Sequence, residues 1–319
     1  MKIVILDGYT TDEGTLSWID LAKLGELTYY ERTAPEQRLE RAKDAEILIS
    51  NKVVLDRELL SQIPNLKYIG LLSTGYNIVD LDYAKSKNIP VCNIPDYSTK
   101  SVAQLTIALL LELTMAVGRH NASVVDGDWE RCKDFCYRVQ DIIELDGKTM
   151  GLIGYGSIAK EVAKSAKALG MKVLASRRTP FESDGIAQSV SLDTLLSQSD
   201  VISMHCPMNK DSDKLIDDKA IAKMKDGVII INTARGGVVD EVALRKGLDS
   251  GKIGGYGADV LSSEPPKDNP LIGAPRCYIT PHIAWASTEA RTRLMKIAID
   301  NVKSYLDGNI KNCVYDIKG

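Results

Sequence analysis

The sequence predicts an α/β protein built from two Rossmann-like domains, each with a doubly wound parallel sheet. Two observations support this fold class. Short apolar runs alternate with helical patterns twice along the chain, and a glycine-rich turn stands directly between a strand and a helix in the second series. The length of 319 residues also suits two domains, because domains cluster near ~100–200 residues.

The first series occupies the first ninety-odd residues. Strands are predicted at "KIVIL", "EILIS", "YIGLLS" and "PVCNI", and helical patterns lie between them at "AKLGEL" and "DRELLSQI". A long helical segment then begins near Thr99 and is apolar on most faces, so we expect it to be buried. This segment marks the boundary between the two domains.

The second series begins at Lys148. Its apolar runs are short enough to be buried parallel strands, and they read "TMGLIGYG", "KVLAS", "DVISMHCP", "GVIIINTA", "GGYGADV" and "CYITPH". One amphipathic helix follows, capped by Ser287 and ended by Gly308. If it packs on the N-terminal half, the first domain is discontinuous and comprises residues 1–97 and 287–319, and the second comprises 98–286.

Composition and charge exclude several classes of protein. A net charge of −3 without a basic stripe argues against a nucleic-acid partner. The apolar run "LTIALLLELTMAV" is broken by Glu112 and two threonines, which argues against a membrane span. The apolar run at the N-terminus is too short, and is followed too early by a charged residue, for a signal peptide. The six cysteines are scattered without a metal-ligand pattern, which suggests reduced thiols. We therefore expect a cytoplasmic protein without a metal.

The turn in "GLIGYGSIA" predicts a dinucleotide-binding site. Gly154, Gly156 and Ala159 fit G-x-G-x-x-G/A, in which the first glycine permits the tight turn and the second lets the backbone approach a pyrophosphate. The following helix offers free N–H groups to phosphates, and its positions Ile158, Val162, Ala166 and Leu169 should share one buried face. The alternative is a glycine turn that binds no ligand.

The cofactor is suggested by "LASRRTP", where an NAD-binding chain usually carries an acid. Ser176, Arg177 and Arg178 stand at that place, and a guanidinium can pair with a 2′-phosphate through charge-assisted hydrogen bonds. We therefore expect NADP as the preferred cofactor and NAD as the alternative. Otherwise both arginines are only solvated surface charges.

Three histidines limit the search for a general acid. His120 reads as a surface or capping residue, and His205 either flanks the cofactor or serves packing. His282 follows a strand end and a proline, where open α/β sheets present functional groups. Arg235 in "INTARGG" could bind a carboxylate, and Glu264 in "DVLSSEPP" could hold a charged imidazole.

These motifs together identify a family resemblance over essentially the whole chain. "GLIGYGSIA", "INTARGGVVDE", "GADVLSSEPP" and "TPHIAWAS", in this order, resemble the D-isomer-specific 2-hydroxyacid dehydrogenases. "LDGYT", "NKVVLD", "STGYNIVDL" and "NIPDYSTKSVAQ" are most similar to the glycerate dehydrogenase or hydroxypyruvate reductase branch. Ala159, in place of a third glycine, and Gln104, in place of a frequent glutamate, depart from the pattern.

The resemblance implies a catalytic set of Arg235, Glu264 and His282, in which Arg235 binds the substrate carboxylate and His282 donates the proton in a reduction. It implies an active site between the domains, a substrate domain at 1–97 with 287–319, and a dinucleotide-binding domain at 98–286. The implied substrate-binding residues are Ser73, Thr74, Gly75, Arg235, His282 and Trp285. The implied cofactor-binding residues are Gly154, Tyr155, Gly156, Ser157, Ile158, Ser176, Arg177, Arg178, Cys206, Pro207, Thr233, Ala234 and Asp259.

The resemblance further implies a homodimer through the arm at residues 99–140, with Phe135 and Tyr137 lining the neighbouring site. Hydroxypyruvate is the expected substrate and glyoxylate the second, while Asn51 and Lys52 lie in a loop that should influence specificity. Reductases for phenylpyruvate, 3-phosphoglycerate dehydrogenases and non-catalytic dinucleotide-sensing corepressors are the alternatives.

Overall fold

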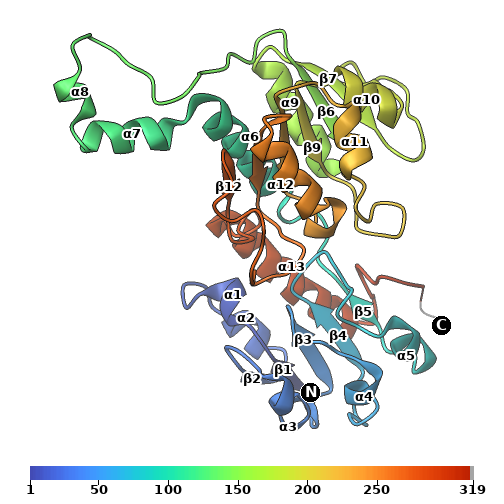
Figure 1. The fold of residues 1–319 in the computed structure, drawn as a ribbon. Helices are drawn as coiled ribbons and strands as arrows, with labels where there is room; N and C mark the ends of the chain where they lie inside the picture. Colours follow the sequence, from blue (N-terminus) through green and yellow to red (C-terminus); the bar gives the residue numbers. More distant parts are fainter. Residues whose placement is uncertain (317–319) are drawn as a thin grey trace. The chain divides into compact units, whose positions relative to one another are not determined.

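The structure is a computed structural model that describes residues 1–316, and these residues form two compact units. Unit 1 contains residues 1–98 and the chain from residue 286 onward, and unit 2 contains Thr99–Trp285. These bounds differ by one residue from the domain bounds expected from the sequence. Each unit has a parallel sheet covered by helices (Figure 1), which confirms the predicted α/β class.

Residues 1–98 contribute a five-stranded parallel sheet with the order β2-β1-β3-β4-β5. This order is that of flavodoxin-like domains, in which ligands bind where the strand order reverses, next to the first strand. The strands are β1 (Lys2–Ile5), β2 (Glu26–Tyr29), β3 (Ile47–Ser50), β4 (Tyr68–Leu71) and β5 (Val91–Cys92).

Strand β2 corrects the sequence interpretation. We expected a helix over "AKLGEL", but helix α2 covers only Ile19–Ala22 and the chain then turns into β2. At Gly25 a Cβ would lie 2.4 Å from the carbonyl oxygen of Met1, so the chain passes β1 too closely for any side chain. The strand lies at the sheet edge and is only half-buried, which explains its weak apolar pattern.

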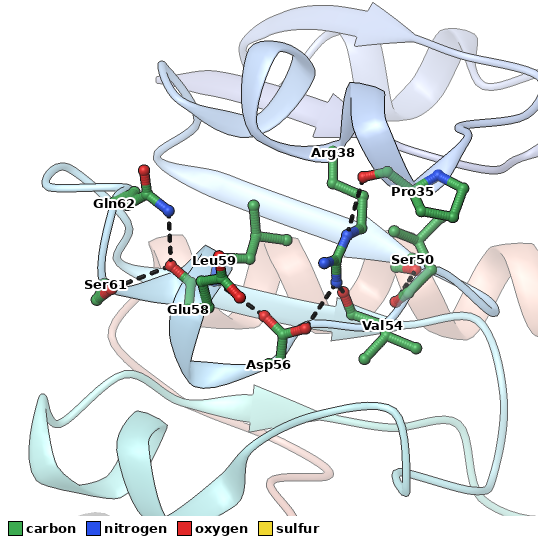
Figure 2. A network of polar contacts seen from close by, with 10 residues as sticks. Pro35, Arg38, Ser50, Val54, Asp56, Glu58, Leu59, Ser61 and Gln62 are labelled. Carbon is green, nitrogen blue, oxygen red and sulfur yellow. Dashed lines mark hydrogen bonds and ion pairs between the residues drawn. The ribbon is translucent and has the colours of Figure 1, made fainter.

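Short helices connect the strands of unit 1, and polar contacts at their ends hold them in place. Asp56 caps α4 by accepting a hydrogen bond of 2.9 Å from the Leu59 N–H. The Arg38 guanidinium donates 2.8 Å bonds to Asp56 and to the Val54 carbonyl, which joins the start of α3 to the start of α4 (Figure 2). The bounds of the short helices are α1 (Tyr9–Asp12), η1 (Pro35–Gln37), α3 (Arg38–Ala42), α4 (Arg57–Leu60) and α5 (Leu81–Ser86).

The last helix, α13 (Thr288–Leu306), belongs to unit 1. Ser287 accepts a 3.2 Å hydrogen bond from the Ala290 N–H at its start, and Gly308 follows its end with a φ of 76°. The Tyr305 ring lies 4.8 Å from the Tyr68 ring of β4. The helix therefore packs on the sheet formed by the first 98 residues, and unit 1 is discontinuous in sequence.

Residues 99–285 contain a seven-stranded parallel sheet with the order β12-β11-β10-β9-β6-β7-β8. Six of these strands follow the Rossmann order, with β6 at the centre where the order reverses. The two-residue strand β8 was not expected from the sequence. The strands are β6 (Thr149–Ile153), β7 (Lys172–Ser176), β8 (Gln188–Ser189), β9 (Val201–Met204), β10 (Val228–Asn232), β11 (Ile253–Ala258) and β12 (Cys277–Ile279).

The segment after Thr99 is not one long helix. Helix α6 (Thr99–Met115) buries one side against unit 2, but Ala116 adopts a left-handed φ of 48° and ends it. Helices α7 (Val117–Val125) and α8 (Asp128–Arg131) extend away from the sheet of unit 2 (Figure 1). No single helix of the described chain has the length and apolar character to cross a membrane, and only the bent pair α6 and α7, with 54° between them, meets both requirements together.

Four further helices pack on the sheet of unit 2: α9 (Ser157–Ala168), α10 (Leu192–Gln198), α11 (Asp218–Lys223) and α12 (Glu241–Asp249). Helix α9 buries Ala159, Val162, Ala163 and Ala166. The expected apolar face was therefore only partly right, because Ile158 is half-buried and Leu169 lies after the end of the helix and is exposed. The face consists mainly of small side chains, so the helix can approach the sheet closely.

Candidate active site

The glycine turn lies between β6 and α9 in unit 2. Gly154 has a φ of 88°, and a Cβ there would lie 2.7 Å from the backbone of His205 and Cys206, so only glycine fits. At Gly156, by contrast, no heavy atom of the described residues lies within 4 Å of the Cβ position. Open space at Gly156 and uncapped N–H groups at the start of α9 form the kind of cradle that binds a pyrophosphate.

Tyr155 and Ser157 flank Gly156 in this turn. The Tyr155 side chain is buried, stacks on Phe181 with ring centroids 4.5 Å apart, and donates a 2.7 Å hydrogen bond to Asp184. Burial raises the pKa of Tyr155, and the hydrogen bond to Asp184 adds to that rise. The side chain of Tyr155 is therefore held by Phe181 and Asp184, and its backbone is the part that can face a cofactor.

The two arginines after β7 are exposed side chains at the edge of the same unit. Arg177 donates a 2.6 Å hydrogen bond from Nε to the Thr179 carbonyl, and its guanidinium lies 5.2 Å from the centre of the Phe181 ring. Arg178 is exposed and forms no hydrogen bond or ion pair with the residues that the structure describes. The Ser176 carbonyl accepts a 2.8 Å bond from the Gly154 N–H, so the glycine turn and the arginines are directly connected.

His205, Cys206 and Pro207 follow β9 and pass directly beside Gly154. Burial lowers the pKa of His205 to about 4, and its Nε2 lies 2.9 Å from the Ser203 hydroxyl. His205 is therefore neutral near pH 7 and cannot serve as a protonated acid there. Burial also raises the pKa of the half-buried Cys206 thiol.

Arg235 lies in the turn that follows β10. Asn232 is fully buried and holds this turn from both sides, because its Nδ2 donates to the Arg235 carbonyl at 2.9 Å and its Oδ1 accepts from the Ala234 N–H at 3.0 Å. The Arg235 side chain is exposed. A Cβ on Gly236 would lie 1.9 Å from the Leu261 carbonyl carbon, so the turn contacts the loop that follows β11.

Glu264 and His282 form a hydrogen-bonded pair in the loops that follow β11 and β12. The Glu264 carboxylate lies 2.5 Å from His282 Nδ1, and its other oxygen accepts a 3.1 Å hydrogen bond from the Leu261 N–H. His282 has a φ of 55°, a backbone conformation that residues with a Cβ rarely adopt. Its Nε2 forms no hydrogen bond with the described residues. A carboxylate therefore orients the ring through one nitrogen and leaves the other available.

Asp259 explains how the unusual turn at His282 is held. Its carboxylate accepts 2.8 Å hydrogen bonds from the N–H groups of Ile283 and Ala284, and a 2.6 Å bond from the Thr280 hydroxyl. Asp259 is nearly fully buried, and burial raises its pKa although these hydrogen bonds oppose the rise. Thr233, at the end of the neighbouring strand, is buried against Thr106 of α6, with their hydroxyls 2.9 Å apart.

The loop with Ser73, Thr74 and Gly75 follows β4 in unit 1. The Ser73 hydroxyl donates to the Gly75 carbonyl at 2.7 Å, and the Thr74 hydroxyl donates to the Ile94 carbonyl at 2.8 Å. Asn93 Nδ2 also donates to the Thr74 carbonyl at 2.7 Å. The loop is therefore braced by the segment that follows β5.

Comparison with known proteins identifies the family. The family model of the D-isomer-specific 2-hydroxyacid dehydrogenase NAD-binding domain matches residues 107–284, more than half of the chain. A hydroxypyruvate reductase of Blautia hydrogenotrophica is 49% identical over 98% of this chain and 99% of its own length. The chain belongs to the D-isomer-specific 2-hydroxyacid dehydrogenase family. It is an NAD(P)-dependent oxidoreductase that acts on the CH–OH group of 2-hydroxy acids.

Two further comparisons extend over nearly the whole dehydrogenase. A glycerate dehydrogenase of Methylorubrum extorquens is 43% identical and covers 98% of both chains. The solved structure of an acyclic imino acid reductase in complex with NADPH and D-Arg has a TM-score of 0.88 and 32% identity, and covers 99% of this chain and 100% of its own. The fold class and the family expected from the sequence are both confirmed.

Several residues that shape the dehydrogenase's candidate site were not found by sequence reasoning. Asn232, which holds the Arg235 turn, and Asn93, which braces Thr74, were not named. Asp259 was expected near the nicotinamide, but its contact with the His282 turn was not anticipated. A polar residue at the end of a buried strand was the available signal for Asn232 and Asp259, because such a group needs hydrogen-bond partners.

Three further candidate residues of the dehydrogenase, His120, Phe135 and Tyr137, lie in the arm at residues 99–140. His120 lies within α7, where it contacts the Ala116 carbonyl at 2.8 Å and accepts a 3.3 Å bond from the Val139 N–H. Tyr137 is hydrogen-bonded to Ser123 at 3.0 Å, and Phe135 is 89% exposed. Trp285 is half-buried at the end of unit 2.

Asn51 and Lys52, the other expected specificity loop of the dehydrogenase, are fixed by the carboxylate of the half-buried Asp7. It accepts backbone bonds from Asn51 at 2.8 Å, Lys52 at 2.5 Å and Val53 at 3.1 Å. Burial raises the pKa of Asp7, and these hydrogen bonds lower it. An open cavity of about 580 Å³ lies beside this loop, and Lys52 is among its lining residues.

Proposed function

We propose that this dehydrogenase reduces a small 2-oxo acid, with hydroxypyruvate as the main substrate and glyoxylate as the second. The observation that carries the proposal is the Glu264–His282 pair, in which a carboxylate 2.5 Å from Nδ1 leaves Nε2 available to donate a proton. The hydroxypyruvate reductase and glycerate dehydrogenase names of two extensive relatives support the choice of substrate.

Arg235, Glu264 and His282 take distinct roles in this proposal. The Arg235 guanidinium binds the substrate carboxylate in a bidentate manner and polarises the adjacent carbonyl. His282 gives a proton from Nε2 to the developing alkoxide. Glu264 is the residue that orients the ring, because its carboxylate holds Nδ1 and turns Nε2 away from itself.

The loop of unit 1 contributes to substrate binding. We assign the substrate carboxylate to the backbone N–H groups around Ser73, Thr74 and Gly75, whose conformation is supported by the bonds to Ile94 and Asn93. Trp285 completes the set as an apolar neighbour of the substrate. In this assignment unit 1 is the substrate domain and unit 2 the dinucleotide-binding domain.

The residues of unit 2 suit a nicotinamide dinucleotide. Gly156 and the N–H groups at the start of α9, including those of Ser157 and Ile158, would hold the pyrophosphate. Cys206 and Pro207 would lie along the adenosine, and Thr233, Ala234 and Asp259 near the nicotinamide. When bound, the reduced cofactor supplies the hydride that the substrate C2 accepts.

We further propose that NADPH is the preferred cofactor. Arg177 and Arg178 are exposed cations at the end of the second Rossmann strand, where a 2′-phosphate would lie, and no carboxylate pairs with either among the described residues. The NADPH in the related imino acid reductase structure is consistent with this choice.

The decisive experiment compares catalytic efficiency across hydroxypyruvate, glyoxylate, pyruvate, phenylpyruvate and 3-phosphohydroxypyruvate with NADPH and with NADH. We expect the highest kcat/KM for hydroxypyruvate with NADPH. A higher value for phenylpyruvate would overturn the substrate assignment. Binding of NADPH without turnover of any acid would instead support a dinucleotide sensor.

The assembly proposed for this enzyme is a cytoplasmic homodimer formed through the arm at residues 99–140. Exposed apolar side chains gather there: Val117 is 65% exposed, Val125 is 77%, Trp129 is 52% and Phe135 is 89%. Such a cluster is costly to leave in water and is typical of a protein interface. The six free thiols suit the reducing conditions of the cytoplasm.

A further inference from the structure

Two cysteines of unit 1 lie side by side although 220 positions separate them along the chain. Cys92 ends β5 and is fully buried, and Cys313 belongs to residues 309–316, which follow α13 and are here named the strap. Cys313 is only partly buried, and an isolated antiparallel bridge pairs it with Cys92. Neither thiol belongs to the candidate active site.

The hydrogen bonds around this bridge define the geometry of the pair. The Asn93 N–H donates to the Asn312 carbonyl at 3.0 Å, and the Val314 N–H donates to the Val91 carbonyl at 2.9 Å. Because the flanking residues carry the bonds, Cys92 and Cys313 form a non-hydrogen-bonded pair, whose Cα atoms are typically ~4.5 Å apart. Disulfides span Cα separations of about 4.4–6.8 Å, so the pair lies at the short end of the bonding range.

The surroundings of the two thiols differ. Burial raises the pKa of Cys92 to about 12, and the neighbouring Cys313 contributes to the rise while the Tyr68 hydroxyl opposes it. That hydroxyl is buried without a conventional hydrogen-bond partner among the described residues. A reagent in solvent therefore reaches Cys313 first, and Cys92 is the thiol that completes the reaction.

The strap is connected to the loop of Ser73–Gly75 by a chain of asparagines. Asn312 Nδ2 donates to Asn301 Oδ1 at 2.8 Å, and Asn301 Nδ2 donates to the Asn93 carbonyl at 3.0 Å. Asn93 in turn donates to the Thr74 carbonyl at 2.7 Å. Movement of the strap away from β5 would break the bonds from Asn312 to Asn301 and to the Asn93 N–H, and so release two groups that position Asn93 beside Thr74.

We propose that Cys92 and Cys313 are a redox modification site, at which a low-molecular-weight disulfide creates an intrachain disulfide that fastens the strap and steadies the loop around Thr74. The consequence for the loop rests on the proposed role of Ser73–Gly75 in substrate binding. Formation of the disulfide does not depend on that role.

The chemistry is two successive thiol–disulfide exchanges. The Cys313 thiolate attacks the small disulfide, so that a mixed disulfide forms and one small thiolate leaves. The Cys92 thiolate then attacks the Cys313 sulfur and releases the second small thiolate. The two cysteines lose two electrons and two protons, and the small disulfide is reduced to two thiols that take up these protons.

The first experiment counts thiols in the full chain after incubation with oxidised glutathione at pH 8.5. Titration of the denatured protein should show a fall from six thiols to four, and peptide mapping should link the peptides that carry Cys92 and Cys313. Closing so long a loop should also raise the Tm by about 5 °C or more. Dithiothreitol should reverse both changes.

Matched variants separate this pair from Cys132 and Cys136, the cysteines that are close in sequence. In the C132S/C136S variant the loss of two thiols should persist, and in C313S it should disappear. A loss that maps to Cys132 and Cys136 would overturn the proposal. So would a stable mixed disulfide at Cys313 that Cys92 never resolves.

The second experiment tests the connection to the loop with N312A, and N309A is the control because the Asn309 side chain is exposed and forms no hydrogen bond in the described chain. Reduced N312A should show a hydroxypyruvate KM about 3- to 10-fold higher, with kcat and NADPH affinity within about twofold of wild type. Oxidation should restore the KM because the disulfide replaces the lost bonds. The N309A variant should match wild type.

Amide hydrogen exchange distinguishes failure of this proposal from failure of the proposed function. In reduced N312A the amides of Asn93, Ile94 and Val314 should exchange at least about tenfold faster than in wild type, and oxidation should slow them again. Unchanged exchange would refute the connection through Asn312. Faster exchange with an unchanged KM would instead mean that the loop does not bind substrate.

Discussion

At the scale of single residues, the pair of Glu264 and His282 contains most of the proposed chemistry. The carboxylate contacts Nδ1 at 2.5 Å, so the ring has one orientation and Nε2 is the only nitrogen left to donate a proton. The left-handed backbone of His282 persists because Asp259 holds the two following N–H groups. The position of the proposed acid therefore depends on a buried carboxylate that binds the backbone beside it.

Replacement of His282 by Asn should remove the proton donor and leave the glycine turn untouched. We expect kcat for hydroxypyruvate to fall on the order of 10²–10⁴-fold, with the NADPH dissociation constant within about threefold of wild type. Stopped-flow turnover and fluorescence titration of NADPH measure the two quantities. Near-normal turnover would mean that another group supplies the proton.

Replacement of Glu264 by Gln should slow the proton transfer from His282. A neutral amide oxygen is a weaker acceptor for Nδ1–H than a carboxylate, so the ring is held less firmly and kcat for hydroxypyruvate should fall by about tenfold or more. The NADPH dissociation constant should stay close to that of wild type, because the glycine turn is untouched. Stopped-flow turnover and NADPH titration measure the two quantities, and an unchanged kcat would remove Glu264 from the role assigned to it.

The free energy of unfolding should depend on pH through His205. Burial lowers its pKa from 6.5 to about 4, so between these values the unfolded state binds more protons and stability falls as pH falls. The uptake of one proton can change the free energy of unfolding by at most about 1.4 kcal/mol per pH unit. Urea titrations at pH 7 and pH 5 should show a smaller loss in His205→Gln, and equal losses would contradict the assignment.

At the scale of elements, the candidate site residues of unit 2 lie at the carboxyl ends of parallel strands. In unit 2 the turns after β6, β7, β9, β10 and β11 carry the glycine cradle, the arginines, Cys206, Arg235 and the Glu264 loop. Gly154 contacts the segment after β9, and Gly236 contacts the loop after β11. These contacts join neighbouring turns, so that separate loops form one surface within the unit.

The turn after β7 allows a test of cofactor choice. A charge-assisted pair with phosphate contributes on the order of 1.5–3 kcal/mol, so the wild type should prefer NADPH over NADH by roughly tenfold to a hundredfold or more. Arg177→Asp should lower kcat/KM with NADPH and maintain or raise it with NADH, because the new carboxylate repels phosphate and accepts from a ribose hydroxyl.

The measurement is the ratio of the two efficiencies at low and at high salt. The wild-type preference should weaken as salt rises, since the cations are exposed. Arg178→Ala serves as the companion variant, and a loss with both cofactors would place Arg178 on the adenine. Equal wild-type use of NADH and NADPH at low salt would count against the phosphate clamp.

At the scale of the whole molecule, the arm at residues 99–140 is unusual because it exposes large apolar side chains to solvent. Helices α7 and α8 extend away from the sheet of unit 2 (Figure 1). Val125 of α7, Trp129 of α8 and Phe135, which follows α8, are exposed. Val125→Asp should convert the proposed dimer to a monomer, because a buried carboxylate at an apolar interface is strongly unfavourable. Sedimentation equilibrium measures the mass.

The control for this variant is Ile19→Asp, which places the same charge on an apolar residue that is 63% exposed but lies outside the arm. Its mass should equal that of wild type. A wild-type chain that sediments as a monomer of about 34.9 kDa would refute dimerisation.

Local patterns were sufficient to predict the α/β class, the glycine turn and the family from the sequence. These patterns are apolar runs of strand length, a turn that needs glycine, and motifs in fixed order. It also identified Arg235, Glu264 and His282 as candidates, although their roles stay predictions. It misjudged β2 and the helix break at Ala116, where edge exposure and one left-handed residue outweighed the apolar pattern.

Contacts between distant residues were decided only by the tertiary structure. Nothing in the spacing of Asp259 and Ile283, of Asn93 and Thr74, or of Cys92 and Cys313 predicts that they meet. Each contact forms because a parallel sheet brings strand ends together, and because α13 returns to the first sheet and leads the strap alongside β5. Periodicity specifies which face of an element is buried, but only packing of the complete chain specifies which elements become neighbours.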